Sequence, residues 1–188
     1  PEDPVRLFGT VTLGGRPFAG ANMTIFPEGG ELYSNLAMTA VGEDGHYEVT
    51  LDGPGGYTTN LQTIGTGPGQ QSTIEYRLEI PSATEHRHDF ELPLGRISGH
   101  VVGPDGRGIS GERVTVTLDS DARSDRMFGG QYSELVSGED GAFEVLPLRP
   151  GTYRVSAGGA PMMGLGEGHL GRVTQGGLVL GEDQALDG

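Results

Sequence analysis

Residues 138–145 read Gly-Glu-Asp-Gly-Ala-Phe-Glu-Val, and residues 150–153 follow as Pro-Gly-Thr-Tyr. An earlier copy reads Gly-Glu-Asp-Gly-His-Tyr-Glu-Val at residues 42–49 and Pro-Gly-Gly-Tyr at residues 54–57, with the same spacing. Asp-Gly between alternating runs predicts a β-hairpin, because glycine adopts positive φ without a steric penalty. The chain is therefore predicted to contain two copies of one small β module.

The repeat also sets the predicted domain organisation. The 188 residues would suit one medium domain or two small ones, and the repeat favours two. Glycine (35 residues) and proline (12 residues) mark many turns, while the apolar alternation between them argues against disorder. We predict an all-β fold of two tandem seven-stranded Greek-key β-sandwiches, with module one at residues 1–95 and module two at residues 96–188.

Module one has the strand number and spacing of a complete β-sandwich. Its seven strands are predicted at residues 5–13, 22–26, 36–41, 46–51, 57–64, 72–80 and 89–94.

Module two is predicted to lack its last strand. Strands are expected at residues 96–102, 114–118, 133–137, 142–146 and 151–157, with weak strands at 170–173 and 178–180. No counterpart of Asp89-Phe90-Glu91-Leu92 follows, and Asp187-Gly188 stands where that strand should begin. Because a missing edge strand exposes backbone groups and core, either a continuation past Gly188 or another chain is expected to supply it.

Composition restricts the class of partner. The net charge of −14 comes from 26 acidic residues and 12 basic ones, all arginine, and so disfavours nucleic acid. Without lysine, no lysine–asparagine isopeptide crosslink can form within the chain, and without cysteine no disulfide can form. No apolar run reaches the ~20 residues that span a membrane, so no membrane insertion by this segment is predicted. A start without methionine or signal peptide suggests a piece of a longer protein.

Several shared motifs carry a family resemblance. Matching pairs stand at residues 9–11 and 99–101 (Gly-x-Val), 15–17 and 106–108 (Gly-Arg-x), and 20–23 and 111–114. With Asp-Gly-x-aromatic and Pro-Gly-x-Tyr, the set resembles the carboxypeptidase regulatory-like domain. The resemblance implies a prealbumin-like (transthyretin-like) sandwich, common in tandem in bacterial secreted and surface proteins, and implies no activity. The Tyr-Arg-Gly-Ser motif of hydrolase relatives of transthyretin is absent.

Two polar clusters are candidate metal sites. His86 and His88 would share one face of a strand, a spacing that can bind a metal, but no third ligand is evident and an exposed polar strand end is the simpler explanation. The run Asp119–Asp125 holds three carboxylates that could bind calcium, but it lacks the glycine and glutamate of an EF-hand and is more simply a solvated loop. No cofactor is otherwise predicted, and the metal ligands stay unknown.

The other conspicuous residues are predicted to be structural. Glu43-Asp44 and Glu139-Asp140 supply turn geometry, and Tyr57 and Tyr153 are expected to bury their rings and bond a backbone partner. Core or sheet-face positions are expected for Phe8, Phe26, Tyr47, Phe90 and Phe143, and no site is assigned to His46, His100 or His169. No helix follows the glycine-rich stretches 65–69 and 158–171, so neither is predicted to hold phosphate. No catalytic motif is found.

These observations predict a non-enzymatic structural or spacer module of an extracellular or cell-surface bacterial protein. Its expected partners are copies of itself or adjacent domains of a longer chain. In a finer form of the hypothesis, copies assemble end to end into a fibre by strand donation, with Pro1–Leu13 as the donated segment. The alternative is a calcium- or glycan-binding accessory module of a larger secreted enzyme or outer-membrane receptor.

Overall fold

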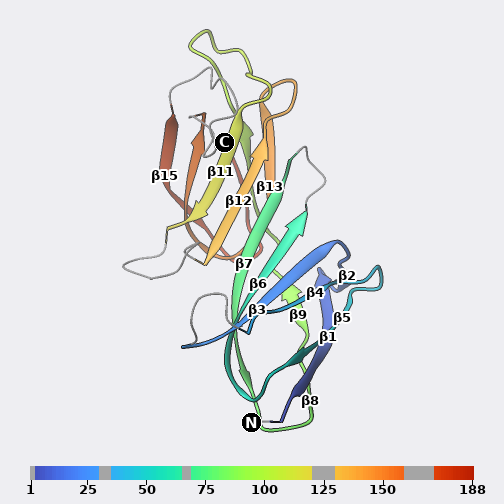
Figure 1. Ribbon diagram of the computed structural model, residues 1–188. Coiled ribbons are helices and arrows are strands. Elements are labelled where there is room, and N and C mark those ends of the chain that lie inside the picture. Colours follow the sequence, from blue (N-terminus) through green and yellow to red (C-terminus); the bar gives the residue numbers. More distant parts are fainter. Residues whose placement is uncertain (1–2, 30–34, 65–68, 120–129, 159–171) are drawn as a thin grey trace. The chain divides into compact units, whose positions relative to one another are not determined.

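The computed structural model describes residues 3–29, 35–64, 69–119, 130–158 and 172–188. The described chain is all-β, as predicted, and forms sandwich-like pairs of sheets (Figure 1). Its contacts divide it into two compact units. Unit 1 comprises residues 1–64 and 73–92, and unit 2 comprises residues 65–72 and 93–188. That the two modules, residues 1–95 and 96–188, fold independently of each other remains a prediction.

Unit 1 is a sandwich built around its first strand. In one sheet, β1 (Val5–Leu13) lies between antiparallel β5 (His46–Leu51) and the parallel pair β8 (Glu85–Arg87) and β9 (Phe90–Leu92), with β2 (Arg16–Pro17) at its end. The other sheet has the order β7 (Gln71–Ile80), β6 (Gly55–Ile64), β3 (Ala21–Pro27) and β4 (Ala37–Ala40).

The core of unit 1 follows from period-two alternation. Val5, Leu7 and Val11 of β1 are fully buried, because successive side chains of a strand point to opposite faces. Phe90 and Leu92 of β9 are only 2% and 1% exposed. The last strand of unit 1 therefore fills the core as well as closing the sheet.

Unit 2 repeats this plan. One sheet has β10 (Gly95–His100) between antiparallel β13 (Ala142–Leu148) and parallel β16 (Ala185–Asp187). The other has the order β15 (Val173–Leu180), β14 (Gly151–Ala157), β11 (Arg113–Leu118) and β12 (Gln131–Val136).

The repeated Asp-Gly turn has the predicted geometry in both units. Gly45 and Gly141 adopt φ values of 78° and 81°. The carboxylates of Asp44 and Asp140 accept the amide two residues later, from His46 at 3.1 Å and from Ala142 at 3.0 Å. Aspartate thus fixes the turn through its side chain, and glycine permits the backbone conformation.

The two predicted core tyrosines are confirmed. Tyr57 and Tyr153 are 6% and 0% exposed. Their hydroxyls donate to backbone carbonyls four residues earlier, those of Gly53 and Arg149, each at 2.8 Å. Burial raises the pKa of Tyr153 above its usual range, since the charged phenolate would lose its hydration.

A buried glutamine organises the same corner of unit 2. Gln131 is fully buried; its amide donates to the Pro147 carbonyl at 2.6 Å, and its oxygen accepts from Arg149 N and the Tyr153 hydroxyl, each at 3.0 Å. No sequence pattern indicates this role for Gln131, because its three partners lie 16 to 22 positions away.

Two expectations for the end of the chain are corrected. The weak strand predicted at residues 178–180 is part of one longer strand, Val173–Leu180. A register shift between Tyr153 and Val155 of β14 accommodates Gly176 and Gly177 of this strand. Most of the strand predicted at residues 170–173 lies outside the described residues. The short strand β16 was not predicted at all.

Replacing Gly9 by alanine is expected to destabilise unit 1. A Cβ at this position would lie 1.9 Å from the His88 carbonyl oxygen, so β8 and β1 would have to separate. Overpacking of this kind costs about 1–3 kcal/mol, measurable by urea unfolding. Gly176→Ala is the matched control, because a Cβ there meets nothing within 4 Å. Equal stability of the two variants would contradict the close approach.

Replacing Gln131 by leucine is expected to lower the free energy of unfolding by about 1–3 kcal/mol, because buried polar partners would be left unpaired. The control is Gln62→Leu, at an exposed position of β6. Thermal unfolding followed by circular dichroism compares the two. A loss for Gln131→Leu no larger than for the control would show that the buried network contributes little.

Candidate functional site

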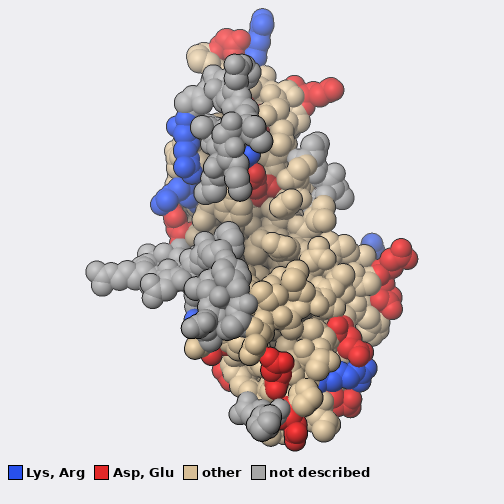
Figure 2. Space-filling view, in the orientation of Figure 1, with Lys and Arg blue, Asp and Glu red and all other residues tan. Residues whose placement is uncertain are grey.

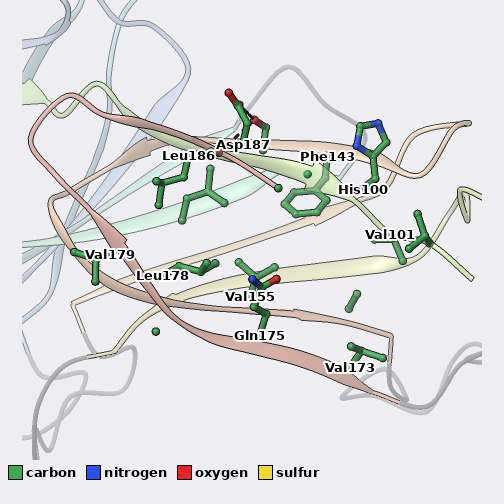
Figure 3. Close-up of a pocket in the computed structure, with 17 residues that line it drawn as sticks. His100, Val101, Phe143, Val155, Val173, Gln175, Leu178, Val179, Leu186 and Asp187 are labelled. Atoms are coloured by element: carbon green, nitrogen blue, oxygen red, sulfur yellow. Dashed lines mark hydrogen bonds between the residues drawn. The ribbon is translucent and has the colours of Figure 1, made fainter. Parts of the chain in front are cut away.

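A groove in unit 2 is the candidate site. It has a volume of about 430 Å³ and lies between the two sheets of the unit (Figure 3). Its lining is mainly apolar, and the side chains that matter below are Val101, Val102, Phe143, Val155, Val173 and Leu186. Figure 3 shows the Phe143 ring and the Val155 side chain at this cavity, with Leu186 of β16 close by.

The matching strand registers of the two units identify the part of unit 1 that corresponds to the groove. β8 pairs with β1 in parallel, with Arg6 opposite Glu85, and β16 pairs with β10 in parallel, with Arg96 opposite Ala185. The next backbone hydrogen bonds also match, from His88 N to Phe8 O at 2.9 Å and from Gly188 N to Ser98 O at 3.0 Å. Gly188 therefore occupies the place in unit 2 that His88 occupies in unit 1.

In unit 1, the chain beyond His88 enters the core as β9. Phe90 pairs with Val11, and its ring centroid lies 5.6 Å from that of Tyr47 and 4.9 Å from that of Tyr76. The Tyr47 hydroxyl donates to the His88 carbonyl at 2.6 Å. Burial raises the pKa of Tyr47 above its usual range.

The equivalent place in unit 2 is open. Phe143, opposite Gly99, stands where Tyr47 stands opposite Gly9. Among the described residues of unit 2, no strand lies beside Val101 and Val102 as β9 lies beside Val11. Val102 is 57% exposed, and the Phe143 ring is only half-buried. In the described part of unit 2, the groove thus lies where β9 lies in unit 1, next to β10.

The described part of unit 2 also has a smaller hydrophobic core than that of unit 1. The described part of unit 1 buries sixteen hydrophobic residues in one cluster, whereas that of unit 2 buries nine. Val173 of β15, at the mouth of the groove, is 69% exposed. Exposed apolar surface of this kind marks a place where another segment can gain stability by burial.

The structure brings the predicted histidine pair together without assembling a metal site around it. The rings of His86 and His88 are 6.4 Å apart, and the His88 ring packs edge-on against Phe90 at 4.6 Å. Burial, and secondarily the charge of His86, lowers the pKa of His88. Within the described ranges, no group of three or more metal-binding side chains lies close enough to hold an ion. The contacts of His88 place it at the junction of β8 and β9.

The predicted calcium loop is described only at its first residue. Asp119 pairs with Arg154 at 3.0 Å, so the described carboxylate has a cationic partner. Residues 120–129 lie outside the described residues, as do His169 and most of both glycine-rich stretches. His46 is exposed on β5, and His100 lines the groove, a role that sequence alone did not suggest.

Asp89 joins β9 to the backbone of β1. Its carboxylate accepts hydrogen bonds from Thr10 N at 2.9 Å and from the Thr10 hydroxyl at 3.0 Å, and Arg87 pairs with it at 3.1 Å. The bond from the Thr10 amide, followed by that from Arg87, lowers the pKa of Asp89 below its usual range. The acidic residue before Phe90 therefore has a defined structural role.

Arginines of the described residues form ion pairs at the surface of both units. Arg6 pairs with Glu48 at 2.7 Å, and Arg96 pairs with Glu144 at 3.3 Å in the equivalent place of unit 2. On the face that Figure 2 shows, acidic side chains occur in small groups, some of them beside arginine. No helix in the described part of the chain has the length and apolar character needed to cross a membrane.

Comparison with known proteins finds remote structural likeness only. Neither a protein-family model nor a curated protein sequence matches the chain. The TIE protein of Bacillus anthracis matches 98% of this chain and 33% of its own, at 16% identity and a TM-score of 0.36. A streptococcal ancillary pilin matches 98% of this chain and 61% of its own, at 14% identity and a TM-score of 0.36. The chain thus spans less than two thirds of either protein.

A third similar structure is a DUF3823 family protein from Parabacteroides merdae. It matches 84% of this chain and 91% of its own, at 14% identity and a TM-score of 0.37. Scores this low do not establish a shared topology, so the resemblance to the carboxypeptidase regulatory-like domain stays a prediction.

Unit 1 is expected to lose stability as the pH falls below the unfolded pKa of histidine, about 6.5, and on through the lower folded pKa of His88, because His88 must then be protonated in its partly buried place. Its folded pKa lies below the unfolded value, so the neutral form stabilises the fold above the unfolded pKa. That stabilisation is lost as the pH falls through the folded pKa. In His88→Gln the decline in melting temperature should be smaller, whereas the exposed control His46→Gln should decline like the unsubstituted chain. Identical declines in all three would refute this role of His88.

Proposed function

We propose that the chain is a non-enzymatic structural module of a cell-surface protein, in which a β-strand at the module boundary closes each sandwich. The groove of unit 2 is the observation that carries this proposal. In unit 1 the same position is filled by β9, which ends at Leu92, and β10 of unit 2 begins at Gly95. A strand that closes one sandwich thus stands directly before the next, which suits a chain of joined modules.

The roles of the repeated residues support a structural function. Asp44 and Asp140 fix turns, and Tyr57 and Tyr153 anchor cores. The motif that occurs twice is therefore accounted for by folding. A surface location comes from the family resemblance, which implies tandem modules in bacterial secreted and surface proteins.

Assembly of separate chains into a fibre by strand donation stays a prediction, with one part of it corrected. The groove of unit 2 supports an acceptor. The expected donor, Pro1–Leu13, is not free, because β1 is paired along both edges and its Val5 and Leu7 are fully buried. Donating β1 would take apart the core of unit 1.

The accessory-module alternative has no specific observation in its favour within the described ranges. Its calcium loop lies mostly outside them.

The proposed function predicts that the chain is displayed outside the cell. Antibodies raised against it should label intact cells of the source organism, and protease added to intact cells should remove the label. The control is an antibody against a cytoplasmic protein, which should label only lysed cells. Labelling by the chain's antibody only after lysis would overturn the surface assignment.

A further inference from the structure

We infer that the groove of unit 2 is the seat of one further β-strand, supplied by polypeptide joined to Gly188 and running parallel to β10. The expected sequence of this strand is acidic, aromatic, polar, then aliphatic. The inference deepens the proposed function and rests on it only in treating the groove as the place where one module meets the next.

The direction and starting point of the strand follow from β16. Gly188 N donates to Ser98 O at 3.0 Å, so the backbone at Gly188 is already in register with β10 at the entrance of the groove. Gly188 also lines the groove together with His100 and Val101. A residue added to Gly188 in the same direction would lie beside His100, as Asp89 lies beside Thr10 in unit 1.

The first residue of the strand is expected to be acidic. In unit 1, the Asp89 carboxylate accepts from the Thr10 amide at 2.9 Å, at the point where β8 passes into β9. His100 is the residue of unit 2 equivalent to Thr10, by the matching Gly9 and Gly99 registers. A carboxylate here would accept from the His100 amide and fix the crossover in the same way.

The second residue is expected to be aromatic. Phe90 contacts the Tyr47 ring in unit 1, and Phe143 offers a ring in the equivalent place of unit 2. An aromatic pair adds stability beyond that from burial of the rings. The Phe143 ring is half-buried and borders the groove, so an incoming ring would cover it.

The third and fourth residues follow the alternation of β9. Glu91 is exposed and Leu92 is 1% exposed, because neighbouring side chains of a strand point to opposite faces. The strand that fits unit 2 is therefore expected to carry a polar residue outward and an aliphatic residue into the groove.

A strand explains the groove better than an apolar small molecule does. The groove runs past His100, Val101 and Val102. The Val101 backbone already bonds to Gly141 and Ile109, so an open edge here presents the backbone groups of His100 and Val102. An added strand satisfies these groups and buries apolar side chains together. A small apolar ligand would cover the side chains and leave the backbone edge unpaired.

Polypeptide joined to Gly188 fits the position better than a second copy does. A strand from another molecule would have to begin against Gly188, which already occupies the entrance. The described N-terminal strand β1 is held in its own core, and the Pro1–Pro4 segment before it contains no large apolar side chain of the aromatic or aliphatic kind that the groove fits.

The test extends the full chain after Gly188 by Asp-Phe-Glu-Leu, the sequence of residues 89–92. The control extension, Asp-Ser-Glu-Ser, has the same length and charge. With the first extension, the melting temperature of unit 2 should rise by about 5 °C or more relative to the control. Amide exchange at His100 and Val102 should slow at least about tenfold, since a new ladder would protect these groups.

A second variant guards against a trivial gain from added apolar residues. Val102→Glu in the chain extended by Asp-Phe-Glu-Leu should cancel most of the gain, because it places a charge beside the new strand. Equal melting temperatures and exchange rates for the two extensions would overturn the inference, provided that their circular dichroism spectra agree.

Two further outcomes would contradict the inference: one concerns which molecule supplies the strand, and the other concerns whether a strand fills the groove at all. If the unextended chain self-associates through the groove and the Asp-Phe-Glu-Leu extension leaves this association unchanged, a second copy fills the groove. If an apolar dye binds the extended and unextended chains equally, the groove is a small-molecule pocket. Neither result depends on where the protein resides, so failure here is distinguishable from failure of the cell-surface proposal.

Discussion

Each unit depends on a parallel ladder between its first strand and its last described one. In unit 1 this ladder joins β1 to β8 and β9, and in unit 2 it joins β10 to β16. The paired strands are far apart in the sequence, about eighty residues in unit 1, as between Arg6 and Glu85, and about ninety in unit 2, as between Arg96 and Ala185. Forming such a pairing costs chain entropy, and the burial of apolar surface must offset that cost. In unit 1, β9 buries Phe90 and Leu92, whereas in unit 2 β16 contributes only the half-buried Leu186. The difference between the two units therefore lies in how much core their closing strand carries.

The features that the sequence predicted are those controlled by local chemistry. Asp140-Gly141 sets its turn through an aspartate side chain two residues from the amide it accepts and a glycine at positive φ. Tyr153 reaches a carbonyl four residues back. Alternating burial along β1 follows from period two. For these elements, the residues that decide the conformation are near one another in the chain, so the repeat identified both hairpins, both tyrosine anchors and the all-β class.

The features that the sequence did not predict depend on distant partners. β16 has three residues with one half-buried apolar side chain, too short a pattern to distinguish from a loop. β15 continues through Gly176-Gly177 because β14 provides a continuous partner across the register shift. Gln131 is identified only by the carbonyl, amide and hydroxyl that surround it. The groove was foreseen in part, because the repeat identifies no counterpart of Phe90 and Leu92 within residues 96–188. Its lining by Phe143, Val155 and Val173 required the folded unit.

The parallel neighbours at the ends of unit 1 also decide how it would carry a mechanical load. Tension applied through the polypeptide pulls β1 from its amino end and β9 from its carboxyl end, and these two strands are adjacent and parallel. The force is then directed along the strands, so their hydrogen bonds are loaded in shear and must yield together, whereas antiparallel hairpin partners pulled at their shared open end separate one bond at a time. Forced unfolding is governed by the rate of crossing this barrier rather than by equilibrium stability. Unit 1 has the strand geometry of a domain that resists extension, and the length of the ladder beside the first strand sets how many bonds share the load.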